Sequence, residues 1–124
     1  MVRILITDDH RLVRAGFKKI LEEEDDLQVV GEAGSGAEAL DFVRNHDVDL
    51  VLLDISMPGE NGLDVLPRLK QLNPKLHVLM LSMYAGEVFA GRAQAAGADG
   101  YLTKESAAEE LVNAIRKILA INDH

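Results

Sequence analysis

The sequence contains no cysteine, only three prolines and few aromatic residues among its 124 residues. Without cysteine the chain can form neither disulfides nor thiolate metal sites, and thiol catalysis is excluded. Its longest apolar runs hold about five residues, whereas a membrane-spanning helix needs about 20. The amino terminus runs from Met1 straight into the acidic pair Asp8 and Asp9, which is unlike a signal peptide. We therefore expect a cytoplasmic protein that does not enter a membrane.

Basic residues are also scarce, with 13 lysines and arginines against 21 aspartates and glutamates, and the formal net charge is −8. A surface this acidic repels phosphate backbones, so we expect no direct binding to nucleic acid. The apolar fraction of 48% and the charged fraction of 27% are ordinary for a globular protein. No repeat of fixed period and no linker-like stretch divides the chain, which predicts a single domain.

Short apolar segments alternate with segments of helical spacing along the whole chain. The apolar segments predict strands at 2–7, 27–33, 50–53, 76–81 and 100–102. The helical spacing predicts a helix after each strand, with capping boxes at Ser35–Glu38 and Ser106–Glu109 and a glycine stop at Gly97. Five βα units predict an α/β, doubly wound fold around a five-stranded parallel sheet of order 2-1-3-4-5.

Polar side chains follow four of the predicted strands at the same edge of this sheet. Asp8 and Asp9 follow the first strand, Asp54 the third, Ser82 the fourth and Lys104 the fifth. Ligands bind at this edge in such folds, and neighbouring strands lie only about 4.8 Å apart. The negative charges of three carboxylates so close together repel one another, so either one carboxylate takes up a proton or a cation enters. The oxygen ligands predict Mg²⁺, with Mn²⁺ as an alternative.

Each of these residues also has a simpler interpretation when taken alone. Asp9 can be a helix cap, Asp54 a loop carboxylate and Lys104 a solvated charge. We favour the functional interpretation because all of them end strands on one side of the sheet. His10 lies beside the acidic pair, but no second histidine or cysteine stands at ligand spacing, so we do not expect it to bind metal.

At these residues the sequence resembles the receiver domains of the response regulators in two-component signalling. The resemblance covers essentially the whole chain and rests on four motifs in order, which lie at residues 6–10, 53–62, 81–84 and 97–104. The first, third and fourth motifs resemble the NarL/FixJ-type branch, whose members usually carry a C-terminal LuxR-type helix-turn-helix domain that binds DNA. The resemblance implies the flavodoxin-like fold of CheY and a role in transcription regulation.

The resemblance also implies a role for each residue of the sheet edge. Asp54 would be the phosphoacceptor, and Lys104 would contact the phosphoryl oxygens together with Ser82. Tyr101 would be the switch aromatic that moves with Ser82. The ligands of Mg²⁺ would be the side chains of Asp8, Asp9 and Asp54 and the backbone carbonyl of Ser56.

The resemblance further implies partners and boundaries. The phosphoryl donor would be a phosphohistidine on a sensor histidine kinase or a phosphotransfer protein, and a phosphorylation-dependent homodimer is a family expectation. We expect residues 1–121 to form the receiver domain and residues 122–124 to be a tail or the start of a linker to an output domain. Many receivers have proline after the lysine, whereas Glu105 stands here, so the geometry of that peptide bond stays open.

The predicted first helix is basic in an otherwise acidic chain, because it carries Arg11, Arg14 and Lys18. These residues either form a solvated face or dock the kinase.

Two other function classes compete with the receiver. A phosphatase of the haloacid-dehalogenase type would place an aspartate two residues after the nucleophile, where Ser56 stands. A flavodoxin-like nucleotide binder would need a phosphate loop rich in glycine or hydroxyl residues, where Asp8, Asp9 and His10 stand. We favour the receiver, for which the resemblance implies a domain that promotes its own phosphorylation and dephosphorylation but is not an enzyme acting on other substrates.

Overall fold

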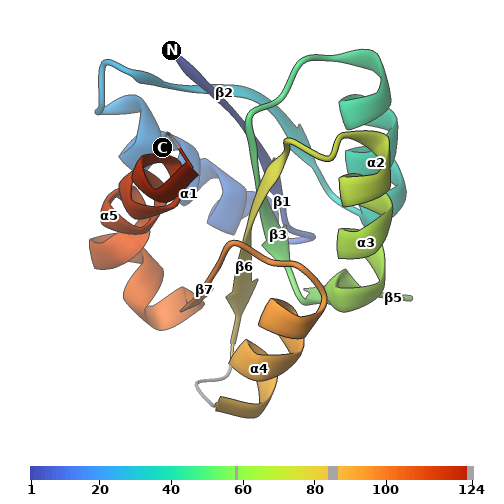
Figure 1. Ribbon diagram of the computed structural model, residues 1–124. Helices are drawn as coiled ribbons and strands as arrows, with labels where there is room; N and C mark the ends of the chain where they lie inside the picture. Colours follow the sequence, from blue (N-terminus) through green and yellow to red (C-terminus); the bar gives the residue numbers. More distant parts are fainter. Residues whose placement is uncertain (58, 84–86, 123–124) are drawn as a thin grey trace.

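A five-stranded parallel sheet forms the centre of the molecule in the computed structural model, which describes residues 1–57, 59–83 and 87–122 (Figure 1). Its strands are β1 (Val2–Thr7), β2 (Leu27–Ala33), β3 (Leu50–Asp54), β6 (His77–Ser82) and β7 (Gly100–Thr103). The helices between and after them are α1 (Arg11–Glu22), α2 (Gly36–Asn45), α3 (Gly62–Leu72), α4 (Glu87–Ala95) and α5 (Lys104–Asn122). The strand order is β2-β1-β3-β6-β7, which confirms the predicted order 2-1-3-4-5.

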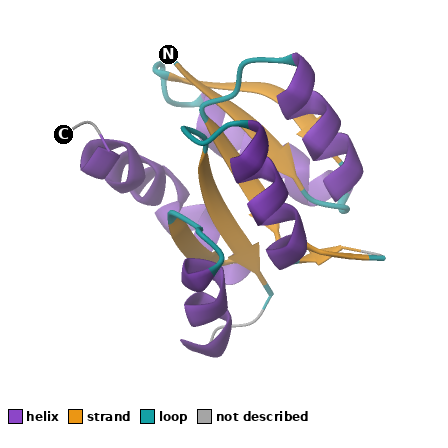
Figure 2. Ribbon diagram, turned by 45° about the vertical axis from the view of Figure 1, so that its right-hand side comes forward, coloured by secondary structure: helices purple, strands orange, loops and turns teal. Residues whose placement is uncertain are grey.

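The sheet is covered by helices on both faces, as its nearly continuous apolar strands require. One face packs against α1 and α5 through a cluster that includes Phe17, Leu111 and Ile115. The other face packs against α2, α3 and α4 through a cluster that includes Val43 and Leu66. Figure 2 shows the helices on either side of the sheet. No helix in the described part of the chain is long and apolar enough to span a membrane.

The ends of the helices agree with the prediction at two positions and differ from it at a third. The Ser35 hydroxyl accepts a hydrogen bond from the Glu38 amide at 3.2 Å, which confirms the first capping box. Gly97, with φ of 103°, follows the end of α4 as predicted. The prediction of a second box beginning at Ser106 was wrong, because α5 begins at Lys104 and the Thr103 hydroxyl accepts from the Ser106 amide at 3.2 Å.

A two-stranded hairpin between β3 and α3 was not predicted, because the sequence there indicates only a loop with a turn. Its strands are β4 (Ser56–Met57) and β5 (Glu60–Asn61). Pro58, in the predicted turn, lies outside the described residues, and Gly59 has φ of 74°. The Asn61 side chain accepts a hydrogen bond from the Leu63 amide at 2.9 Å and so begins α3, which continues through Pro67.

At the edge of the sheet opposite the polar residues, Asp49 joins three strands. Its carboxylate accepts hydrogen bonds from the Arg3 amide at 2.8 Å and from the Arg3 Nε at 3.1 Å. Its backbone amide donates to the Arg3 carbonyl, and its carbonyl accepts from the His77 amide. The hydrogen bond with the Arg3 side chain is the main reason that the pKa of Asp49 is lowered.

Asp49→Asn should therefore lower the free energy of unfolding in a pH-dependent way. A carboxyl group whose pKa is depressed by folding stabilises the protein above its unfolded-state pKa, and this contribution is lost as the pH falls through the folded-state pKa. The free energy of unfolding of the wild type should exceed that of the variant most at neutral pH. The difference should disappear as the pH falls below about 4. Urea unfolding at several pH values tests this. Asp47→Asn, at an exposed aspartate 3.4 Å from Arg3, is the matched control, and an equal effect there would contradict the prediction.

Candidate functional site

The ends of four strands bring the predicted polar residues to one edge of the sheet. Thr7 pairs with Leu53, so Asp8 and Asp54 each stand one residue beyond this pair on the adjacent strands β1 and β3. Asp54 pairs with Leu81, and Ser82 with Thr103. Lys104 follows directly as the first residue of α5. The parallel pairing therefore places all four polar residues at neighbouring strand ends.

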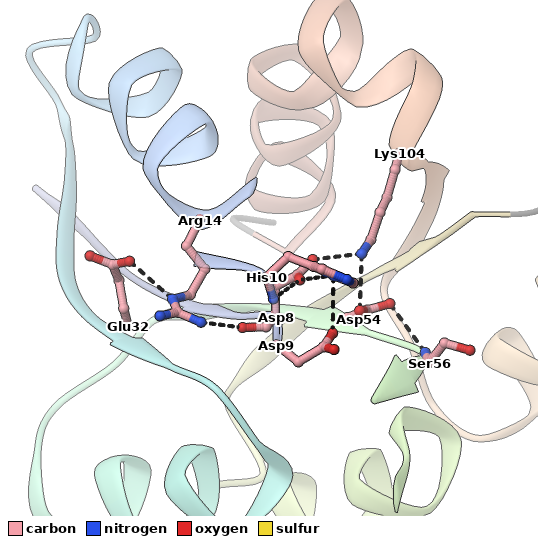
Figure 3. Close-up of polar contacts among 8 residues, drawn as sticks. All are labelled: Asp8, Asp9, His10, Arg14, Glu32, Asp54, Ser56 and Lys104. Carbon is pink, nitrogen blue, oxygen red and sulfur yellow. Dashed lines mark hydrogen bonds and ion pairs between the residues drawn. The ribbon is translucent and has the colours of Figure 1, made fainter. Parts of the chain in front are cut away.

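The centre of the site is one ammonium group between two buried carboxylates. The Lys104 Nζ lies 2.7 Å from Asp8 Oδ2 and 3.0 Å from Asp54 Oδ2 (Figure 3). Asp8 and Asp54 are both fully buried, and the Lys104 side chain is only 10% exposed. The pairing is therefore desolvated, so that removing one partner leaves a buried charge uncompensated.

Burial raises the pKa of Asp54, because a carboxylate loses its hydration there, and the negative charge of Asp8 raises it further. Lys104 opposes this shift without cancelling it. For Lys104 itself, burial lowers the pKa, but the two carboxylates together outweigh burial and raise it. The lysine therefore remains charged, while the neighbouring carboxylates, including Asp9, exceed it in number. The site retains an excess of negative charge.

The residues of this cluster fit a bound divalent cation. Ligand atoms of Asp8, Asp9, His10 and Asp54 all lie within 4.8 Å of one another. Among the described residues, Asp9 Oδ1 is buried without a hydrogen-bond partner. Asp8 Oδ2 likewise accepts no well-directed hydrogen bond, although the Lys104 ammonium lies 2.7 Å away. Carboxylate oxygens gathered in this way are the ligands that hard cations prefer.

Arg14 holds the loop that carries the acidic pair. Its Nη1 donates to the backbone carbonyl of Asp8 at 2.6 Å, and its Nε donates to Glu32 on β2 at 3.1 Å. The Asp8 amide also donates to the Ala33 carbonyl, so the loop is fixed to β2 twice. Of the three basic residues predicted to dock a kinase, Arg14 is thus engaged within the domain, whereas Arg11 is exposed and Lys18 partly exposed.

The loop after β3 is fixed just as closely. The Ser56 amide donates to Asp54 Oδ1 at 3.1 Å, so one oxygen of Asp54 faces this loop while the other faces Lys104. The Glu60 carboxylate accepts from the Gly36 amide at 2.9 Å, which joins the hairpin to the start of α2. At Gly62, an added Cβ would collide with the Asp54 carbonyl oxygen. Glycine is needed there because α3 begins directly against the backbone of Asp54.

The two predicted switch residues lie on adjacent strands, at different depths. Ser82 is buried at the end of β6, one residue beyond the partner of Asp54. Tyr101 is partly buried on β7, opposite Met80, and packs against the cluster that covers the α2–α4 face. Ser82 is thus next to the site, while Tyr101 packs against the cluster that also contains Ala93 of α4.

Two contacts of this site were not predicted from the sequence. The Arg14–Glu32 pair joins residues 18 apart, and the Glu60–Gly36 pair joins residues 24 apart. Neither pair belongs to a local pattern such as a cap or a helical repeat. The only signal in the sequence is a basic residue one turn into the first helix and an acidic residue at the end of the second strand.

Gly62→Ala should destabilise the domain by about 1–3 kcal/mol, since the added methyl group forces the backbone of Asp54 to move. Gly16→Ala is the matched control: an added Cβ meets nothing within 4 Å there, and alanine favours the helix by roughly 0.5–1 kcal/mol. Urea unfolding of both variants measures the difference. A Gly62→Ala protein as stable as the wild type would contradict the close approach.

Lys104→Ala should lower the free energy of unfolding by about 3 kcal/mol in the absence of divalent cations, because the buried carboxylates lose their partner. Added Mg²⁺ should restore most of this loss, since a cation that binds only the folded state stabilises it. Thermal unfolding with chelator and with Mg²⁺ measures both effects. The control Lys19→Ala removes an exposed lysine of α1. It should change neither the stability without divalent cations nor the effect of Mg²⁺. If Mg²⁺ does not reduce the loss of stability in Lys104→Ala, a bound ion does not compensate the carboxylates in place of the ammonium, and the prediction is wrong.

The chain resembles known signalling proteins over most of its length. Residues 4–116 match the family model of the response regulator receiver domain. The chain is 40% identical over 118 residues to the response regulator UvrY of Escherichia coli (strain K12), which covers 95% of this chain and 54% of UvrY. It spans about half the length of the curated relatives that it matches.

Solved structures of response regulators are similar to this chain as well. The two-component response regulator of the LuxR family from Aurantimonas sp. SI85-9A1 superposes with a TM-score of 0.92 at 38% identity, covering 97% of this chain and 86% of that one. A response regulator from Burkholderia pseudomallei, described with a phosphorylated aspartic acid, a calcium ion and citrate, superposes with a TM-score of 0.82 at 26% identity, covering 92% and 66%. The chain therefore belongs to the response regulator receiver domains, the phosphorylation-dependent modules of two-component signalling, and is of the NarL/FixJ type.

Proposed function

We propose that Asp54 accepts a phosphoryl group from the phosphohistidine of a sensor histidine kinase or a phosphotransfer protein. The observation that carries this proposal is the position of Asp54, a fully buried carboxylate held between the Lys104 ammonium and the Ser56 amide at the end of a central strand. A carboxylate whose two oxygens are held in this way is presented in one fixed orientation to an incoming donor.

The transfer follows from what these side chains contact. One carboxylate oxygen of Asp54 attacks phosphorus, the bond from phosphorus to the donor imidazole nitrogen breaks, and the imidazole leaves with the electron pair. Lys104 and Ser82 then donate hydrogen bonds to the phosphoryl oxygens. Asp8, Asp9, Asp54 and the Ser56 carbonyl would hold Mg²⁺, which when bound neutralises the negative charge of the incoming group. Ser56 makes its observed contact through the amide, which leaves its carbonyl available for this role.

The solved relative from Burkholderia pseudomallei supports this assignment, because its description combines a phosphorylated aspartic acid with a calcium ion. The excess of carboxylates over ammonium in the present site also supports it, because an added phosphoryl group requires further positive charge. A divalent cation supplies that charge with oxygen ligands alone.

Phosphorylation would then change the surface near Tyr101. It replaces one carboxylate with roughly −1.5 to −2 charges and three acceptor oxygens. We infer that the Ser82 hydroxyl moves toward these oxygens and that the Tyr101 ring enters the space beside it, altering the face formed by α4, β7 and α5. Each charge-assisted hydrogen bond contributes roughly 1.5–3 kcal/mol, so two or three supply the about 5.5 kcal/mol that inverts a 1:99 population.

The remaining assignments concern the setting of the domain. We infer that residues 1–121 form the receiver unit and that the last residues begin a connection to an output domain that controls transcription; residues 123–124 lie outside the described part. Arg11 and Lys18 on α1 would contact the kinase, and the phosphorylated domain would form a homodimer in the cytoplasm. The domain would catalyse only its own phosphorylation and dephosphorylation.

Asp54→Asn should abolish phosphorylation, because an amide has no carboxylate oxygen to attack phosphorus. The test incubates the protein with acetyl phosphate and Mg²⁺ and measures the intact mass. The wild type should gain one phosphoryl group, the variant none, and addition of a chelator should suppress the gain in the wild type. Asp64→Asn, at an exposed aspartate of α3, should be labelled like the wild type. Equal labelling of Asp54→Asn would refute the assignment.

A further inference from the structure

We propose that His10 is a nitrogen ligand for first-row transition ions, which makes the cation site of this domain selective for them over Mg²⁺ beyond what carboxylates alone provide. The inference rests on the proposed metal site and adds a ligand to it. The ions favoured by this ligand are those with a high affinity for imidazole, such as Co²⁺, Cu²⁺ and Zn²⁺. It revises the expectation from the sequence, which asked for a second histidine or cysteine and did not consider the neighbouring carboxylates as partners.

The His10 imidazole lies about as far from the neighbouring carboxylate oxygens as two ligands of one metal ion lie from each other. Its Nδ1 is 3.3 Å from Asp8 Oδ1 and 3.3 Å from Asp9 Oδ1 (Figure 3). Around an octahedral ion with bonds of about 2.1 Å, adjacent ligand atoms stand about 3.0 Å apart and opposite ones about 4.2 Å. The two separations of 3.3 Å are close to the value for adjacent ligands, whereas the 4.8 Å that encloses Asp54 as well is longer than the value for opposite ligands. Little movement is needed to place one ion against His10, Asp8 and Asp9, with Asp54 close to it.

The oxygen atoms of the site divide into two sets, one for the lysine and one for an ion near His10. Lys104 faces Asp8 Oδ2 and Asp54 Oδ2, whereas His10 faces Asp8 Oδ1 and Asp9 Oδ1. An ion bound beside His10 therefore does not require Lys104 to leave Asp8. The backbone amide of His10 donates to Asp8 Oδ1 at 2.8 Å, which keeps the imidazole close to this oxygen.

The exposure of His10 also favours a ligand role over a structural one. Its side chain is 65% exposed, and it precedes α1 without a side-chain capping hydrogen bond. Neither the core nor the start of the helix depends on the imidazole, so a change at this position leaves the fold intact. Imidazole nitrogen binds transition ions well, whereas Mg²⁺ prefers oxygen, so the extra ligand changes the affinities of the two classes unequally.

The alternative is that His10 only holds the two carboxylates in place through hydrogen bonds. The two roles differ in their effect on Mg²⁺. A positioning group supports binding of every divalent ion to the same degree, whereas a nitrogen ligand affects mainly the ions that accept nitrogen.

The experiment measures the affinities of the wild type and of His10→Gln for Mg²⁺ and Co²⁺ by calorimetric titration at one pH near 7.5. We expect the substitution to weaken Co²⁺ binding at least about tenfold and Mg²⁺ binding less than about threefold, in the range known for lost metal-site interactions. His46→Gln, at an exposed histidine stacked on Phe42 away from the acidic cluster, is the matched control and should bind both ions like the wild type.

Pulsed electron paramagnetic resonance of the Cu²⁺-loaded protein supplies a second readout. Coupling to an imidazole ¹⁴N should appear in the wild type and in His46→Gln and should be absent in His10→Gln. Equal losses of Mg²⁺ and Co²⁺ affinity, unchanged Co²⁺ affinity, or a wild-type spectrum without nitrogen coupling would each overturn the assignment. If only the role of His10 fails, Mg²⁺ binding and phosphorylation of Asp54 persist; if the proposed function fails, the wild type is not labelled by acetyl phosphate.

Discussion

The site depends on the repulsion between carboxylates that the parallel sheet forces together. Asp8 and Asp54 end adjacent strands and are fully buried, and Asp9 stands beside them. One ammonium, from Lys104, compensates only part of their charge. This imbalance gives the edge of the sheet its affinity for positive charge, and the rest of the fold keeps the charges from moving apart.

The restraints on these carboxylates come from all around the sheet edge. Arg14 and β2 fix the loop of Asp8, while the Ser56 amide and the start of α3 fix Asp54. Such supporting contacts determine how accurately a site is held, because each charged group would otherwise turn toward water. Substitutions at these supports therefore alter the site without removing any of its charged groups.

The sequence predicted the gathering of Asp8, Asp9, Asp54, Ser82 and Lys104 at one edge, because apolar periodicity locates the strand ends and parallel pairing aligns them. The strand order was also predicted, but from the common arrangement of five-stranded sheets of this class and not from periodicity. The sequence did not predict the contacts that join distant residues, such as Arg14 with Glu32. The start of α5 was misplaced for a local reason: Thr103 and Ser106 both have side chains that can cap a helix, and Thr103 accepts the hydrogen bond from the Ser106 amide. The hairpin of β4 and β5 and the side-chain orientation of His10 likewise depend on neighbours that periodicity does not specify.

The placement of Lys104 joins the acidic site to α5, the longest helix of the described residues. It is the first residue of α5, so the ammonium that compensates the carboxylates stands at the end of a helix that packs on α1 through Leu111 and Ile115. Binding of another cation, or loss of a carboxylate charge, changes the electrostatic attraction between Lys104 and the carboxylates. Because Lys104 belongs to the first turn of α5, this change acts directly on the helix, with no intervening loop.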